Sequence, residues 1–123
     1  RWCHYRLFFF WQDEISAMQF SCQYDMKVPT TKRQAVVELL AMVNERMWLG
    51  HFDVDSDENT PMFRQTTLLR GSTGASVEQL EDLVDIALTE CERFYPAFQF
   101  VIWGGKSAPD AVSAAILDTV AEA

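Results

Sequence analysis

The stretch VPTTKRQAVVELLAMVNERMWLGHFDVD, residues 28–55, decides the fold because a helical pattern in it leads directly into a strand pattern. Apolar side chains at helical spacing form one stripe: Val36, Leu39, Leu40, Val43 and Met47. Pro29 suits a first helical turn, and Gly50 can adopt the left-handed conformation that ends a helix. We therefore predict a helix over residues 29–49, which packs its stripe on a sheet, and a strand over residues 51–55.

A hairpin is predicted before this helix. Residues 1–12 are rich in aromatic side chains, and residues 18–26 alternate apolar with polar side chains. Pairing Trp11 with Ser16 stacks the apolar positions of both strands on one face, so we expect that register. The other face of the first strand then carries three aromatic side chains outside this core: Trp2, Phe8 and Phe10.

A second hairpin is predicted after the helix, formed by residues 51–55 and 62–69. The segment between the two strands contains the Asp, Asn and Pro residues that are typical of turns. Setting Val54 opposite Phe63 places Asp53 opposite Arg64 on the other face, where the two charges form a favourable cross-strand pair.

Two helices and a strand are predicted in the C-terminal part of the chain. Ser76 and Gln79 have the spacing of a capping box, so a helix begins there, and it is expected to end before the Tyr-Pro pair at 95–96. Residues 97–103 are almost all apolar, which predicts a central strand covered on both faces. Ser107 is expected to cap the last helix.

The predicted order of elements is strand, strand, helix, strand, strand, helix, strand, helix. Hairpins dominate this order, so the expected fold class is α+β, with a mostly antiparallel sheet packed by helices. The chain has 123 residues, of which 49% are apolar, and this is enough to bury one core. We therefore expect a single domain over residues 1–123.

The charge, the length of the apolar runs and the cysteine content indicate which partners and which cell compartment to expect. The net charge of -8 repels a phosphate backbone, so we expect no nucleic-acid partner. The longest apolar runs, such as residues 7–11, are too short to cross a bilayer, so we expect no membrane partner. Cys3, Cys22 and Cys91 lack C-x-x-C spacing, and we predict that they are buried, reduced thiols of a cytoplasmic protein.

One short pattern resembles a nucleotide site. Residues 105–107, Gly-Lys-Ser, resemble the end of a phosphate-binding loop between a strand and a helix. That loop needs an earlier glycine whose bare backbone wraps the phosphate, and Phe100 occupies its place. A turn followed by a helix cap explains these residues, so no cofactor is predicted.

The candidates for metal binding or catalysis also lack essential parts. The D-x-D-x-D pattern at 53–57 resembles the start of a calcium loop, but Glu58 and Arg64 stand where that loop needs Gly and Glu. His4 and His51 have neither the spacing of metal ligands nor a neighbouring nucleophile. We predict no catalytic residues, no metal site and no enzyme activity.

The aromatic surface formed by Trp2, Phe8 and Phe10 is the one candidate functional site. Aromatic side chains set among polar residues are typical of surfaces that bind another protein. A helix or strand that precedes residue 1 would cover the same surface equally well. Both interpretations stay open from the residues alone.

Two segments, residues 38–53 and 92–105, resemble the hallmark segments of the bacterial YbjN-domain family, and residues 1–26 and 62–71 also fit. The resemblance implies a sensory-transduction regulator with no established enzyme activity. It also implies a fold similar to that of type III secretion chaperones, which are small, acidic, cytoplasmic α+β proteins that usually dimerise. Family members usually carry a helix and a strand before the position of Arg1, so we expect both in the full-length protein.

The leading hypothesis is a non-enzymatic, cytoplasmic interaction module, chaperone-like or regulatory, that acts as a homodimer and can bind a further protein partner. The alternative is a sensor that binds a small ligand between the sheet and the helices, beside Trp48 and Trp103. A deep pocket with converging polar groups favours the sensor. A flat, self-complementary apolar patch favours the dimer.

Overall fold

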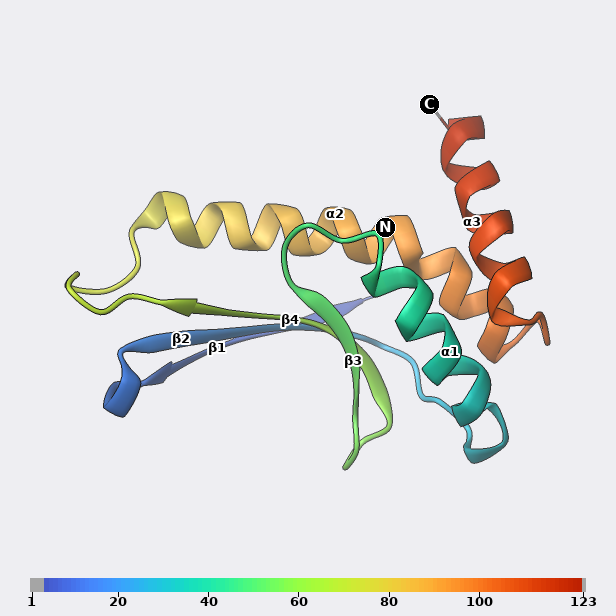
Figure 1. Cartoon of the computed structure of the whole chain (residues 1–123), viewed down its shortest axis with the longest axis horizontal. Helices are drawn as coiled ribbons and strands as arrows, with labels where there is room; N and C mark the ends of the chain where they lie inside the picture. The colour runs from blue at the N-terminus through green and yellow to red at the C-terminus, as the bar shows by residue number, and fades with distance from the viewer. Residues whose placement is uncertain (1–3, 123) are drawn as a thin grey trace.

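The computed structural model of the protein describes residues 4–122 (Figure 1). Its main elements are β1 (Tyr5–Gln12), β2 (Ala17–Tyr24), α1 (Arg33–Asn44), β3 (His51–Asp55), β4 (Thr60–Leu68), α2 (Val77–Ile102) and α3 (Ala108–Glu122). The strands form an antiparallel sheet in the order β1-β2-β4-β3. This arrangement confirms the predicted α+β class.

The helices lie on one side of the sheet (Figure 1). α2 runs along the sheet, while α1 and α3 pack near the C-terminal half of α2 and contact each other. In the part of the chain that is described, no helix covers the opposite side of β1, β2 and β4. Among the described residues, the helices therefore cover one face of the sheet, as expected for an antiparallel sheet that buries one face.

The first hairpin pairs differently from the prediction. Trp11 lies opposite Met18, not Ser16. The reason is the connection between the strands, which is a 3-10 turn over Asp13–Ile15 closed by Ser16 at a φ of 49°. The register moves by an even number of residues, so each side chain keeps the predicted face of the sheet.

The second hairpin shows the same kind of difference. Phe52, not Val54, lies opposite Phe63, and Asp53 lies opposite Met62. The predicted contact between Asp53 and Arg64 nevertheless forms along the diagonal, with 3.3 Å between Asp53 Oδ2 and Arg64 Nη1. Diagonal neighbours in a sheet are within reach of a long side chain such as arginine.

The largest error of the sequence prediction concerns α2. The predicted strand over residues 97–103 is wrong, because α2 continues through Tyr95 and Pro96 to Ile102. All residues from 94 to 98 are buried, since this part of the helix is surrounded by the sheet, α1 and α3. A helix covered on all sides is apolar all round, and its sequence looks the same as a central strand.

Pro96 lies in the interior of α2, where it removes a helical N–H. Such a proline costs about 3 kcal/mol in an ordinary helix. Burial of the neighbouring Phe94 and Phe98 offsets this cost, because large aromatic side chains contribute most to a core. Phe100, which we expected at the centre of a strand, lies on α2 and is half-buried.

The central helix is shorter than predicted. α1 spans Arg33–Asn44 after a 3-10 turn at Thr30–Lys32, and the stripe residues Val36, Leu39 and Val43 are buried as expected. Gly50 does adopt a left-handed conformation, with a φ of 71°, but it lies directly before β3 and not at the end of the helix. The predicted caps of the other two helices are confirmed: Ser76 and Gln79 form a capping box, and the Asp110 N–H donates to Ser107 Oγ at 3.3 Å.

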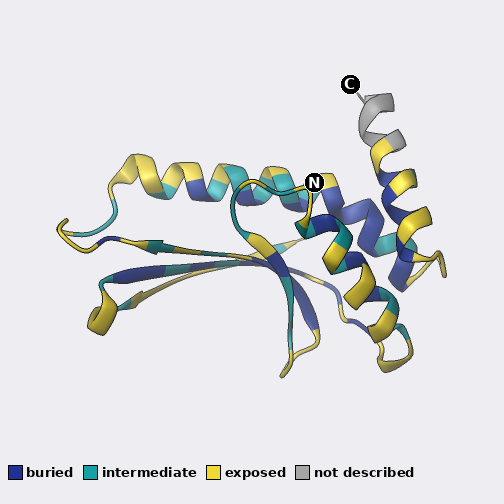
Figure 2. Ribbon diagram, in the orientation of Figure 1, coloured by how far each residue is buried: buried dark blue, intermediate teal, exposed yellow. Residues whose placement is uncertain are grey.

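The C-terminal half of α2 is buried against the rest of the structure, and we call this region the packed end (Figure 2). It is defined by four buried aromatic residues: Tyr24, Phe52, Phe94 and Phe98. The ring of Tyr24 stacks on Phe52 with 6.0 Å between centroids, and its hydroxyl donates to the Cys91 carbonyl oxygen at 2.6 Å. Cys22 and Cys91 are buried as predicted, whereas Cys3 lies outside the described residues.

Candidate functional site

Two of the three predicted surface aromatics lie on the side of the sheet that no described helix covers. Phe8 and Phe10 project from β1 and are 43% and 61% exposed, while Trp2 lies outside the described residues. Leu68, on the same face of β4, is 75% exposed. We call this surface the outer face and define it by Phe8, Phe10 and Leu68.

Polar residues separate the apolar side chains of the outer face. Gln19 lies between Phe10 and Thr66 across the strands, and Ser21 lies between Phe8 and Arg64. The guanidinium carbon of Arg6 lies 5.4 Å from the centre of the Phe8 ring, within the range of a cation–π contact. The outer face therefore combines apolar anchors with hydrogen-bonding groups, as the surfaces of protein interfaces do.

The structure adds two exposed aromatics that sequence reasoning assigned to the core. Phe9 and Trp11 project from β1 toward the helix side of the sheet, yet both are exposed. The N-terminal half of α2 leaves them uncovered, and an open furrow of about 470 Å³ is lined by Phe9 on one side and by Leu80 and Val84 of α2 on the other. Strand alternation assigns a side chain to a face, but it does not show whether a helix covers that face.

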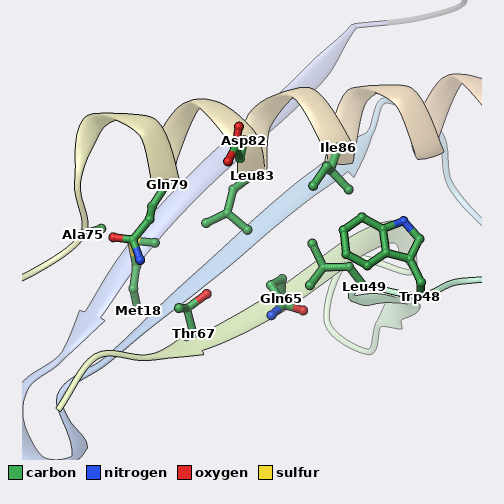
Figure 3. Close-up of a pocket in the computed structure, with 10 residues that line it drawn as sticks. All are labelled: Met18, Trp48, Leu49, Gln65, Thr67, Ala75, Gln79, Asp82, Leu83 and Ile86. Atoms are coloured by element: carbon green, nitrogen blue, oxygen red, sulfur yellow. The ribbon is translucent and has the colours of Figure 1, made fainter.

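A groove lies on the other flank of the N-terminal half of α2, where the helix passes over β2 and β4 (Figure 3). Its volume is about 300 Å³, which is at the lower end of the usual range for small-molecule sites. We call it the Trp48 groove. Its apolar wall is made by side chains from four separate segments: Met18, Trp48, Leu49, Ala75, Leu83 and Ile86.

The Trp48 groove also carries four polar side chains. Gln65 and Thr67 line it from β4, and Gln79 and Asp82 line it from α2. The Asp82 carboxylate is the one ionisable group among the residues that line the groove. The groove can therefore offer hydrogen-bond donors and acceptors together with a single negative charge.

The loop between α1 and β3 brings Trp48 to this groove. Trp48 is 78% exposed, so its indole forms a side of the groove without being part of the core. Gly50 holds the loop close to the sheet, because a Cβ atom at this position would lie 2.4 Å from the Phe63 ring. Of the two tryptophans predicted beside a pocket, Trp48 lines the groove, whereas Trp103 follows the end of α2 and is not among the lining residues.

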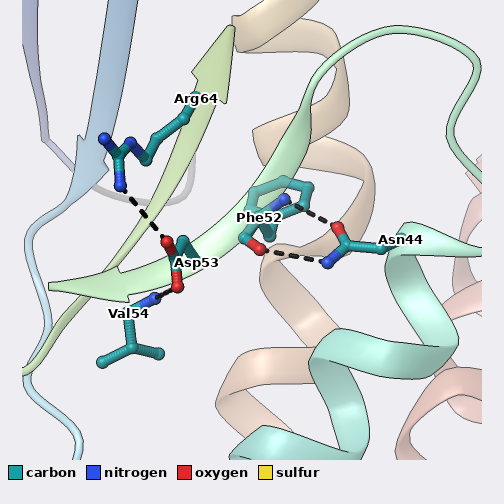
Figure 4. A network of polar contacts seen from close by, with 5 residues as sticks. All are labelled: Asn44, Phe52, Asp53, Val54 and Arg64. Atoms are coloured by element: carbon teal, nitrogen blue, oxygen red, sulfur yellow. Dashed lines mark hydrogen bonds and ion pairs between the residues drawn. The ribbon is translucent and has the colours of Figure 1, made fainter.

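Asn44, the last residue of α1, bonds to the outer edge of β3 at Phe52 (Figure 4). The Phe52 N–H donates to Asn44 Oδ1 at 2.7 Å, and Asn44 Nδ2 donates to the Phe52 carbonyl oxygen at 3.1 Å. The side-chain amide of Asn44 thus makes both bonds that a neighbouring strand would make to Phe52. Within the described chain, β1 pairs only with β2, so its other edge makes no strand pairing.

The positions weighed for metal binding and catalysis lie apart. His4 and His51 are both exposed, and His51 lies opposite Arg64 on the sheet. Among the residues that the structure describes, no three His, Cys, Asp or Glu side chains gather closely enough to hold a metal ion. Over the same residues, no helix is long and apolar enough to cross a membrane.

These features define a class of protein: a small α+β domain with one sheet face open among its described residues and a groove beside its longest helix. The family comparison then identifies the family. The sequence profile of YbjN, described as "Putative bacterial sensory transduction regulator", matches residues 1–100, so the chain belongs to the YbjN family. This confirms the resemblance seen in the sequence. No curated protein and no solved structure gives a match to the chain.

Proposed function

We propose that this YbjN-family protein is a non-enzymatic, cytoplasmic interaction module, chaperone-like or regulatory, that acts as a homodimer through its outer face. The observation that carries the proposal is the exposure of Phe8, Phe10 and Leu68 on one sheet face. Exposed apolar surface set among polar residues can mark a protein interaction site. The regulatory description of the family supports the same kind of role.

The charges around the outer face favour a second copy as the occupant. Arg64 and Asp53 lie on this side of the sheet and form an ion pair of 3.3 Å, so charges of both signs are present. Two copies of such a surface can meet about a twofold axis without strong repulsion. The N-terminal half of α2 lacks this balance, because it carries acidic residues and no basic residue from Val77 to Glu92.

Sedimentation tests the dimer directly. The full-length protein is expected to sediment as a dimer at micromolar concentration, and the double variant Phe8→Asp/Phe10→Asp is expected to shift toward monomer, because buried unpaired carboxylates disfavour association. Val77→Asp is the matched control, since Val77 is an exposed apolar residue at the start of α2. A full-length parent that stays monomeric at high concentration would contradict the homodimer.

The remaining results of this experiment locate the interface. A dimeric parent whose Phe8→Asp/Phe10→Asp variant also remains dimeric would show that the copies meet elsewhere. A shift toward monomer in Val77→Asp as well would show that the effect does not depend on the outer face. Circular dichroism of each variant verifies that the fold is retained.

Thermal unfolding tests the prediction that the protein binds neither a nucleotide nor a metal ion. We expect that neither ATP nor EDTA changes the melting temperature, because a ligand shifts stability only when it binds the native state. A reproducible rise with ATP would support the phosphate-loop interpretation of residues 105–107. A fall with EDTA would indicate a bound metal ion.

A second candidate function, a sensor that binds a small ligand, is favoured by the Trp48 groove. The groove has the mixed apolar and polar lining that is typical of ligand sites, and it lies beside Trp48, as the alternative hypothesis expected. This function and the homodimer use opposite sides of the sheet. A single protein could therefore combine both functions, with ligand binding on one side and self-association on the other.

A further inference from the structure

We propose that the Trp48 groove binds a cationic amphiphile, meaning a small molecule with an apolar body and one amine or guanidine group. The inference rests on the second candidate function above and adds the chemical class of the ligand. It is carried by the shape of the groove, by its lining and by the charge around it.

The apolar part of the ligand is set by the inner wall. Met18 and Leu83 are buried at the base of the groove, and Ile86 and Leu49 are half-buried beside them. A volume of about 300 Å³ accommodates one ring together with a short chain. Removing this apolar surface from water provides the main driving force for binding.

The charge of the ligand is set by Asp82 and its surroundings. None of the residues that line the groove is basic, and Asp82 is the one acidic residue among them. Three more carboxylates, of Glu78, Glu81 and Asp85, lie on the same half of α2, and the whole chain carries a net charge of -8. A positively charged ligand is attracted to this region, and a carboxylate or phosphate is repelled.

Trp48 adds a second group that favours a cation. Its indole lies at one end of the groove, across from the α2 side chains (Figure 3). Tryptophan has the most favourable ring face for a cation. The groove thus combines an apolar base at Leu83 with two lining groups that favour a cation, the indole of Trp48 and the exposed carboxylate of Asp82.

The test uses three probes with the same carbon skeleton: phenylbutylamine, phenylbutanol and phenylbutyrate. Binding to the full-length protein is followed by the indole N–H resonance of Trp48 in NMR spectra, which is assigned from Trp48→Leu. We expect the amine to bind about threefold more tightly than the alcohol, the usual size of a single exposed charge contact. The carboxylate is expected to bind more weakly than the alcohol, and added salt should reduce both differences.

Two variants separate the role of the Asp82 carboxylate from the effect of the overall negative charge of α2. Asp82→Asn is expected to bring the affinities of the amine and the alcohol together. Asp85→Asn is the matched control, because it removes the same charge from the other flank of α2 and should leave the preference intact. Amine preference that survives in Asp82→Asn would overturn the assignment.

The outcomes also distinguish this inference from the functions on which it rests. Equal binding of all three probes to the parent would support a ligand groove but overturn the cationic specificity. No perturbation of Trp48 by any probe would overturn both the inference and the sensor. The Asp82→Asn variant is expected to have the same oligomeric state as the parent in sedimentation. The homodimer is therefore tested separately from ligand binding in the groove.

Discussion

The two halves of α2 differ in how they are covered. At the packed end, the helix contacts the sheet, α1 and α3, and Phe94 and Phe98 are fully enclosed. Along its N-terminal half, which we call the open end, Leu83 and Ala87 are buried, and a furrow and a groove lie on the two flanks. One continuous helix therefore provides both the centre of the core and one wall of the Trp48 groove.

The two edges of the sheet differ in the same way. At the edge of β3, the side chain of Asn44 bonds to the backbone of Phe52. At the other edge of the sheet, β1 pairs only with β2 within the described chain. β1 also presents four consecutive exposed aromatics, residues 8–11. An exposed apolar edge strand can pair with another chain, and the homodimer proposed above would protect this edge.

The largest expected effect contrasts two phenylalanines on the helix side of the sheet. Phe98→Ala at the packed end should lower the free energy of unfolding by about 3–5 kcal/mol, because it leaves a cavity in an enclosed core. Phe9→Ala at the open end should cost less than about 1 kcal/mol, because its ring is already exposed. Urea unfolding measures both, and similar losses would show that the two ends are equally packed.

A smaller loss is expected from Gly50→Ala. The added Cβ would lie 2.4 Å from the Phe63 ring at a left-handed backbone position, so we expect a cost of about 2–4 kcal/mol. Gly71→Ala is the control, because Gly71 also has a positive φ but no atom lies within 4 Å of the added carbon. Equal destabilisation of the two variants would mean that contact with Phe63 does not constrain the Trp48 loop.

The closed edge of β3 is tested by Asn44→Ala. This variant leaves the N–H and carbonyl of Phe52 without their side-chain partner, and a loss of about 1–3 kcal/mol in the free energy of unfolding is expected. Gln34→Ala, at an exposed position of α1, should change stability by no more than about 0.5 kcal/mol. Faster hydrogen exchange of the Phe52 amide in Asn44→Ala would locate the effect at the edge of the sheet.

The smallest effect is expected at the ion pair on the outer side of the sheet. The side chains of Arg64 and Asp53 are nearly half exposed, so Arg64→Gln should cost less than about 1 kcal/mol, and less still in high salt. A loss as large as that of Asn44→Ala would show that Arg64 contributes to packing as well as to charge. Thermal unfolding at two salt concentrations separates these contributions.

Several parts of the candidate sites follow from the sequence. Strand alternation placed Phe8 and Phe10 on the face away from the core, and the even shift of register did not alter that face. The Trp48 groove could be anticipated only in part, because its lining comes from Met18, Gln65 and Gln79 as well as from the loop of Trp48. No local pattern shows that residues so far apart in the chain share one cavity.

The sequence by itself determined the features that depend on neighbouring residues. These are the faces of the strands, the caps at Ser76 and Ser107, the buried stripe of α1, and membership of the YbjN family. Only the tertiary structure decided that residues 97–102 are helical, that Gly50 packs on Phe63, and that α2 is enclosed at one end and open at the other. The physical reason is that a buried apolar run satisfies a helix or a strand equally well, and contacts with distant segments select between them.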